Sequence, residues 1–317
     1  MWVMRRKLGV AATAAVLAFA VGYLFSPIGG ETRPVVAVDD VSPEQLARSL
    51  QASGAVRTRL GAAAVALAGS LGTLDPETGK LVISLGEASV TLPVEDQARR
   101  FVTVAEGQRR EEMANVFAKE LGWTDGEHRD FAGATSTCAF RGGEGYRFPG
   151  RYLVAAGTTP DEVVDAMEDR FGEVYGELVA ASGTPALDPG TVVRVASMIQ
   201  REAAGKGDMR LISGVIWNRM LLGMPLQVDA TLQYAKGKEG RWWPRLTPRD
   251  KRIDSPFNTY QQSGLPPEPI SSPGEAAIAA AMHPADTTCL FYIHDRSRTI
   301  HCSSDYAGHL RNISRYL

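Results

Sequence analysis

The 317-residue sequence has no excess of charge of one sign: 34 lysines and arginines stand against 36 aspartates and glutamates, a net charge of -2. A nucleic-acid-binding protein usually carries a strong basic excess, so we expect no nucleic acid among its partners. Hydrophobic residues make up 44% of the chain and charged residues 22%, which excludes wholesale disorder and a membrane protein of many spans. The length suits two domains of ~150 residues.

Histidine is also scarce. The five histidines form no His-Glu-x-x-His motif and no ligand pair at close helical spacing, which argues against a zinc peptidase. Neither Gly-x-Ser-x-Gly nor Ser-x-x-Lys occurs, so a serine-type enzyme is poorly supported as well. We expect neither a metal nor a cofactor. Internal repeats and low-complexity segments are also absent from the sequence.

The one long apolar run lies at the N-terminus. Three basic residues precede an uncharged stretch whose strongly apolar part, residues 8–25, would span ~27 Å as a helix. That length approaches the ~30 Å hydrocarbon core of a bilayer. We therefore predict that residues 1–30 are a cytoplasmic flank and a single transmembrane anchor of the cell membrane, with the rest of the chain outside. A signal peptide cleaved near Ala18-Phe19-Ala20 is the alternative.

The remaining chain divides into three parts. Pro27, Gly29, Gly30 and Pro34 lie between Ser26 and Val41, and after the anchor, residues 31–41 predict a linker. Residues 42–100 predict a small membrane-proximal module with strands at Lys80–Leu85 and Ala88–Leu92, where β-branched residues flank a glycine. Residues 101–317 predict a mainly helical domain with a C-terminal β-hairpin, so the fold class is α+β.

Capping signals mark the helices of the larger domain. Thr159-Pro160-Asp161-Glu162 has the form of a capping box, and the acids on the outer face of the helix that it starts, Asp165, Glu168 and Asp169 among them, are expected in solvent. Asp188-Pro189 opens a helix that runs to about Ala204. Further helices are predicted after Asp208 and after Ser272, and a long loop-rich stretch, residues 224–271, lies between them.

Glu202 stands out on the helix that Asp188 opens. At 100° per residue it falls between Val195 and Met198, on the flank of the apolar stripe. A carboxyl placed there loses hydration, which raises its pKa and favours a protonated acid. A solvated glutamate paired with Arg201 or Lys206 is the alternative.

Two further patterns suggest chemistry. Trp242 and Trp243 lie among lysines and arginines in the long loop-rich stretch, a pairing that suits a carbohydrate with carboxylates or phosphates; an exposed basic loop is the alternative. Cys289 and Cys302 flank a hairpin with its turn near Asp295, and in a two-residue turn they would face each other. Outside the cell they could form a disulfide, the alternative being two buried thiols. Cys138 is left over and more consistent with packing than with nucleophilic attack.

Five segments, in order and in register, resemble the endolytic murein transglycosylase family (MltG/YceG-like). They are Ala196–Glu202, Ile216–Thr231, Phe257–Tyr260, Ser263–Gly274 and His283–Asp286. The similarity runs from Val192 to the C-terminus and extends more weakly back to Val102. It implies a single-pass, outward-facing enzyme that cuts peptidoglycan glycan strands internally. It also implies a LysM-like module over residues 42–100.

The resemblance carries a set of site residues. The family pattern has two glutamates spaced two apart, of which the second carries the chemistry; here the second is Glu202 and the first is replaced by Gln200. Six polar residues are implied to line the saccharide cleft: Gln227, Asp229, Thr231, Asn258, Thr259 and Tyr260. The family's Phe-Pro-Asp-Thr-Tyr element lacks its acid here, where Gly150 replaces it. Of the C-terminal histidines, His301 is displaced by one position and His309 fits the family better.

The implied reaction needs one acid. Glu202 would protonate the glycosidic oxygen between N-acetylmuramic acid and N-acetylglucosamine. The muramoyl 6-hydroxyl would then close a 1,6-anhydro ring. This reaction does not need the second carboxylate that a hydrolase requires. The expected partners are peptidoglycan glycan strands, the cell membrane and peptidoglycan synthases, with termination of strand elongation as a role. A catalytically lapsed peptidoglycan-binding or division-scaffold protein is the alternative.

Overall fold

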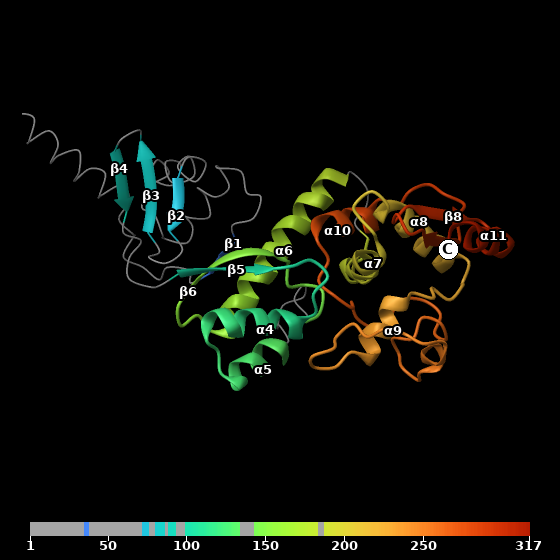
Figure 1. Cartoon of the computed structure of the whole chain (residues 1–317), viewed down its shortest axis with the longest axis horizontal. Helices are drawn as coiled ribbons and strands as arrows, with labels where there is room; N and C mark the ends of the chain where they lie inside the picture. The colour runs from blue at the N-terminus through green and yellow to red at the C-terminus, as the bar shows by residue number, and fades with distance from the viewer. Residues whose placement is uncertain are drawn as a thin grey trace, which may run out of the picture. The chain divides into compact units, whose positions relative to one another are not determined.

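The structure, a computed structural model, describes residues 35–37, 72–75, 80–85, 88–92, 99–133, 143–182 and 187–317, with side chains from Arg100 onward (Figure 1). Mixed helices and small sheets make it an α+β protein. Within these ranges no helix is long and apolar enough to cross a membrane. The predicted anchor, residues 1–30, and Cys138 lie outside the described residues.

The chain divides into two compact units. One comprises Met1–Thr103 with Gly150–Val163, and the other comprises Val104–Pro149 with Val164–Leu317. This division into units differs from the predicted bounds, in which one contiguous domain covers residues 101–317. The cause is β6, which lies between β1 and β5 in one sheet and so joins residues 150–163 to the first unit.

The first unit contains two small sheets. In one, β6 (Gly150–Ala155) lies between β1 (Val35–Ala37), with which it pairs antiparallel, and β5 (Arg99–Val104). Part of the predicted linker is therefore a strand.

The other sheet is an antiparallel meander of β2 (Gly72–Asp75), β3 (Lys80–Leu85) and β4 (Ala88–Leu92). The two strands predicted in the membrane-proximal module are confirmed with their bounds. The LysM-like character of residues 42–100 stays a prediction, because most of these residues lie outside the described part.

The second unit is mainly helical. Its described elements, including α6, which begins at the boundary of the two units, are α4 (Arg110–Leu121), α5 (Asp125–Gly133), α6 (Pro160–Ser182), α7 (Pro189–Glu202), α8 (Met209–Leu221), α9 (Asp229–Lys236), the 3-10 helix η1 (Pro248–Arg252), α10 (Glu275–Met282), β7 (Phe291–His294), β8 (Ile300–Ser303) and α11 (Tyr306–Tyr316). The stretch predicted as loop-rich thus contains α9 and η1, two short elements whose few residues give little periodic signal.

Side chains at the helix ends explain several of these bounds. The Thr159 backbone N–H donates to Glu162 Oε2 at 2.8 Å, which completes the capping box of α6. Asp188 caps α7 by accepting from the Thr191 backbone N–H at 2.8 Å. Gly223, at φ 66°, ends α8 in the left-handed conformation that glycine adopts readily. One prediction for α6 is wrong: Glu168 is buried, whereas the acids on the outer face of this helix were expected in solvent.

Helix α7 lies at the centre of the core of the second unit. Val192, Val195, Ala196 and Ile199 are fully buried along it, as the apolar stripe predicts. It packs against α8 and α10, which flank it in the fold (Figure 1). The last residue of this helix, Glu202, therefore projects from a rigid, densely packed element.

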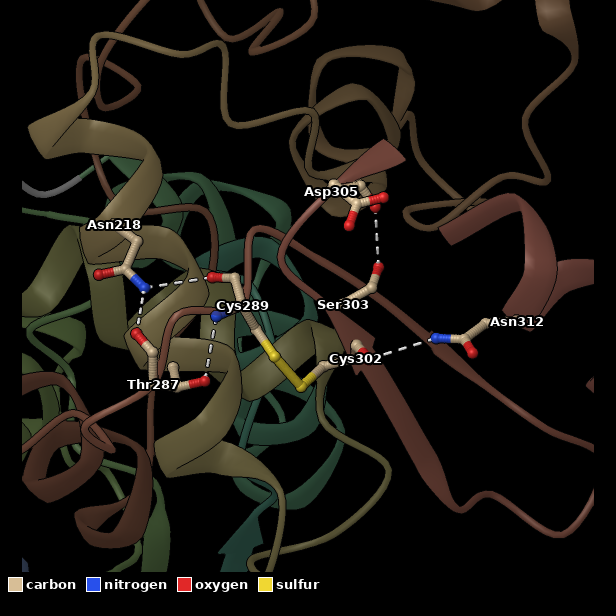
Figure 2. The surroundings of a disulfide bond; sticks show 7 residues. All are labelled: Asn218, Thr287, Cys289, Cys302, Ser303, Asp305 and Asn312. Carbon is tan, nitrogen blue, oxygen red and sulfur yellow. Dashed lines mark hydrogen bonds between the residues drawn. A yellow bond between two sulfur atoms is a disulfide. The ribbon is translucent and has the colours of Figure 1, made fainter. Parts of the chain in front are cut away.

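The C-terminal hairpin differs from its predicted register. Tyr292 pairs with Cys302, and residues 295–299 form the loop, so the turn is longer than two residues and Cys289 lies just before β7. A disulfide nevertheless joins Cys289 and Cys302, with their Cα atoms 5.8 Å apart. Figure 2 shows Asn218 of α8 beside this bond, where its amide donates to the carbonyls of Thr287 at 2.7 Å and Cys289 at 3.1 Å. The hairpin is thereby fixed to α8.

Truncation of the core at α10 should destabilise the second unit. Ile278 is fully buried, so Ile278→Ala should lower the free energy of unfolding by about 3 kcal/mol through lost burial and a residual cavity. Urea unfolding followed by tryptophan fluorescence measures the change; Trp217, whose indole donates to Ala281 O of α10, contributes to this signal. Ile313→Ala on the exposed side of α11 is the matched control and should cost about 0.5 kcal/mol or less; an equal loss in both variants contradicts this account.

Candidate active site

Glu202 is held by three elements that are far apart in sequence. It is the last residue of α7, and its carboxyl is partly buried. The Tyr292 hydroxyl of β7 donates to Oε2 at 2.8 Å, and the Ala230 backbone N–H, in the first turn of α9, lies 3.4 Å from Oε1. The carboxyl therefore has one firm donor and one longer one.

The surroundings of Glu202 favour its protonated form. Burial is the largest influence and raises the pKa of Glu202, and the negative charge of Asp229 raises it further. The hydrogen bonds from Tyr292 and Ala230 and the electrostatic influence of His294 lower it, yet the net pKa is above the usual value. A glutamate in this state can donate a proton at a pH where an exposed glutamate is ionised.

Asp229 and Tyr260 form a second polar pair beside this carboxyl. Asp229 is the first residue of α9 and is exposed, and the Tyr260 hydroxyl donates to its Oδ1 at 2.6 Å. Burial, followed by the bond to Asp229, raises the pKa of Tyr260, so the phenol is a neutral donor at physiological pH. Three of the predicted site residues, Glu202, Asp229 and Tyr260, are thus brought together.

Gln227 lies on the segment that leads into α9. It is exposed, with φ 56° in the left-handed region that is uncommon for residues other than glycine. Its backbone N–H donates to Thr259 O at 3.0 Å, and its Oε1 accepts from Arg219 Nη1 at 3.3 Å. An unusual backbone conformation held by such contacts is frequent at functional sites.

The other three predicted residues, Thr231, Asn258 and Thr259, are buried inside the loop scaffold. The Thr231 and Thr259 hydroxyls lie 2.9 Å apart, and the Asn258 amide donates to Ile253 O at 2.7 Å. Their polar groups are used within the protein, so they shape the site without facing a saccharide directly. Asn258 Oδ1 accepts from the Tyr260 backbone N–H at 3.0 Å and so orients Tyr260.

Comparison with known proteins identifies the family of this chain. The sequence profile of the YceG-like family matches residues 38–315. The chain belongs to the YceG-like family. The crystal structure of a YceG-like protein from Listeria monocytogenes matches with a TM-score of 0.56 over 89% of this chain and 99% of that chain; its 17% identity shows the fold alone.

Two curated relatives carry the name endolytic murein transglycosylase. The protein of Streptococcus pneumoniae strain D39 is 29% identical over 181 residues, which cover 55% of this chain and 32% of that protein. The Bacillus subtilis strain 168 protein is 34% identical over 151 residues, covering 47% of this chain and 41% of that protein. The chain therefore matches less than half the length of each relative.

Gln200 is the position where the resemblance implies a first glutamate, and its contacts show what the amide does in this YceG-like chain. Gln200 Nε2 donates to Glu106 Oε2 at 3.1 Å, and Gln200 Oε1 accepts from the Gly274 backbone N–H at 3.0 Å. The amide joins an acid to the N-terminus of α10. Both contacts lie away from the two groups that donate to Glu202, Tyr292 and Ala230.

The tryptophans of the loop are largely occupied by the protein itself. The Arg201 guanidinium lies 3.7 Å from the centre of the Trp243 ring, whose indole N–H donates to Glu112 at 2.9 Å. Arg109 lies 5.0 Å from the Trp242 ring centre. These contacts indicate a structural role for the two tryptophans, which the sequence pattern had predicted to bind carbohydrate.

The C-terminal histidines also have partners within the protein. His301 Nε2 lies 2.8 Å from Asp295 Oδ2, and the His301 ring stacks on Tyr316 with centres 3.6 Å apart. The His309 ring stacks on Phe291. Among the described residues no group of three or more histidine, cysteine, aspartate or glutamate residues could hold a metal ion.

The sequence interpretation did not assign four residues to the surroundings of the candidate acid: Tyr292, His294, Asp208 and Arg219. Tyr292 and His294 alternate along β7, and both reach acids at the end of α7 or the start of α8. Arg219 donates to Leu226 O at 2.7 Å and Leu290 O at 2.6 Å, which joins the loop before α9 to the hairpin. The alternation of polar residues in the strand was a visible signal, but their partners depend on tertiary structure.

Restoring the family acid at Gln200 should make stability depend on pH. In Gln200→Glu, a second carboxylate would face Glu106, so one of the two would have a folded-state pKa above the unfolded value of ~4.3. A raised folded pKa gives stability that is present at low pH and lost as pH rises. Urea unfolding from pH 4 to 7 should show that the free energy of unfolding of this variant falls increasingly below that of the unaltered chain. Gln262→Glu on the surface should show no such trend. A difference that stays constant with pH contradicts the contact between position 200 and Glu106.

Proposed function

We propose that this YceG-like protein is an endolytic peptidoglycan lytic transglycosylase that cleaves the bond between N-acetylmuramic acid and N-acetylglucosamine within glycan strands. The observation that carries the proposal is the Glu202 carboxyl, partly buried, raised in pKa and held between β7 and α9. The names of the pneumococcal and Bacillus subtilis relatives support the substrate and the reaction.

The proposed reaction uses Glu202 first as an acid and then as a base. Protonated Glu202 gives its proton to the glycosidic oxygen as the bond to the muramoyl anomeric carbon breaks. The muramoyl 6-hydroxyl then bonds to that carbon and its proton returns to the Glu202 carboxylate. The products are an N-acetylglucosamine hydroxyl end and a 1,6-anhydro-muramoyl end, so no water is consumed and the enzyme is regenerated.

A glycoside hydrolase is the second candidate, and Asp229 is the observation that favours it. Its charge raises the pKa of Glu202, so it lies close enough to interact with that carboxyl. In a hydrolase the second carboxylate activates water or bonds to the sugar. Asp229 Oδ1 instead accepts from Tyr260, which suits an orienting role beside the substrate.

The cellular setting is part of the same proposal. The disulfide between Cys289 and Cys302 supports an oxidising environment outside the cytoplasm. The basic and apolar residues at the N-terminus support a membrane anchor with its N-terminus in the cytoplasm. We propose that the LysM-like module follows this anchor and that peptidoglycan synthases are partners, so that the enzyme terminates growing strands.

Mass spectrometry of the products tests the reaction. Purified murein incubated with the whole chain should yield internal fragments with 1,6-anhydro-muramoyl ends. Glu202→Gln keeps the size of the side chain but removes the acid, and should reduce these products by at least ~10²-fold.

Each alternative has a distinct outcome in the same experiment. Reducing ends from the unaltered chain would identify a hydrolase and contradict the lytic reaction. Binding of murein without cleavage by either protein would identify a scaffold. Gln262→Glu, the reverse exchange of glutamine and glutamate at a surface position, is the control and should cleave murein like the unaltered chain.

The pH dependence of cleavage should report the charge of Asp229. Asp229→Asn removes a negative charge but retains an oxygen that can accept from Tyr260. The pKa of Glu202 should fall by about one unit or less, and the alkaline limb of kcat/KM should move to lower pH, because the acid loses its proton earlier. A shift to higher pH, or none, contradicts the proposed influence of Asp229. Asp286→Asn is the matched control and should leave the profile unchanged.

A further inference from the structure

Strand β7 presents two polar side chains to the turn between α7 and α8. Tyr292 and His294 are two residues apart, so they leave the strand on the same face. The Tyr292 hydroxyl donates to Glu202 Oε2 at 2.8 Å, and His294 Nε2 lies 2.6 Å from Asp208 Oδ2. Glu202 ends α7 and Asp208 immediately precedes α8, so the strand contacts both ends of the turn.

Further contacts fix the turn itself. Asp208 accepts from the backbone N–H groups of Ala204 at 2.9 Å and Gly205 at 3.2 Å. Arg298, from the loop of the hairpin, donates to the carbonyl of Ala204. The position of the candidate acid is therefore coupled to the position of the hairpin.

The hairpin is anchored where β7 begins. The disulfide joins Cys289 to Cys302 of β8, and Asn218 of α8 donates to the Cys289 carbonyl (Figure 2). The next residue, Leu290, accepts from Arg219 Nε at 2.6 Å through its carbonyl. Two residues further on lies Tyr292, so a covalent bond and two side chains of α8 fix the backbone that carries it.

We propose that Tyr292 is a positioning residue for the catalytic acid and that the disulfide-closed hairpin holds it in place. Its hydroxyl donates to Glu202 Oε2 at 2.8 Å, and with the longer contact from the Ala230 N–H to Oε1 it fixes the orientation of the carboxyl. Burial raises the pKa of Tyr292 well above its usual range, so the phenol remains a neutral donor throughout the working pH.

The hydrogen bond also has a predictable effect on titration. A donor stabilises the carboxylate, so loss of the Tyr292 hydroxyl should raise the pKa of Glu202. Other charged or titratable groups act on Glu202 or Tyr292 from neighbouring elements: Arg201, Arg219, Asp229, Tyr260 and His294. Tyr292→Phe leaves all of them in the chain, so the change isolates one hydrogen bond.

The first test rests on the proposed function. In Tyr292→Phe, kcat should fall about tenfold or more with KM little changed, and the alkaline limb of kcat/KM should move up by about one pH unit. The direction is opposite to that expected for Asp229→Asn. Tyr306→Phe, on an exposed tyrosine of α11, is the matched control. An unchanged pH profile in Tyr292→Phe would overturn the positioning role, even if the activity fell.

A second test does not depend on the reaction. In the chain labelled with carbon-13 at the glutamate carboxyls, the NMR signal of Glu202 is the one that Glu202→Gln removes. The midpoint of the pH titration of this signal should rise by about one pH unit in Tyr292→Phe. If the midpoint rises but the unaltered chain does not cleave murein, only the proposed function is contradicted. If the midpoint does not move, the role of Tyr292 is contradicted.

The contribution of the disulfide is separable by a double-mutant cycle. Replacing Cys289 and Cys302 by serine should lower kcat several-fold in the chain with Tyr292 but by much less in the Tyr292→Phe chain, because the two changes act through one contact. Equal fold losses in both backgrounds would show that the disulfide does not act through Tyr292.

Discussion

The arrangement of the second unit depends on one constraint: a carboxyl at the end of a fully packed helix loses water and needs donors. Helix α7 buries six apolar side chains and ends at Glu202. Burial raises the pKa of that residue, and donors from β7 and α9, together with His294, offset part of the effect. The loop that carries α9 and the C-terminal hairpin are placed where they can meet this carboxyl.

The two supports of Glu202 differ in construction. On the α9 side, buried hydroxyl and amide groups of Thr231, Asn258 and Thr259 hold the chain from inside. On the hairpin side, a disulfide and the side chains of α8 hold it. Arg219 contacts both segments, through Leu226 O and Leu290 O, so one buried cation links the two supports of the acid.

Local signals predicted the elements that carry the acid. The capping residue Asp188 predicted the start of α7 and the apolar stripe predicted its buried face, although the helix ends at Glu202 and not at about Ala204. The flank position of Glu202 predicted the direction of its pKa shift. The partners of Glu202 lie beyond local sequence, because Tyr292 is ninety residues away along the chain. The burial of Glu168 and the pairing of β6 with β1 likewise depend on contacts between distant segments.

A direct measurement of the Glu202 titration in the unaltered whole chain tests the central claim most closely. The account predicts that this carboxyl loses its proton above the ordinary glutamate value of 4.5, so that at a given pH more molecules retain the acid than an exposed glutamate would. A midpoint at or below that value would contradict the account, because a fully ionised Glu202 has no proton to give to a glycosidic oxygen.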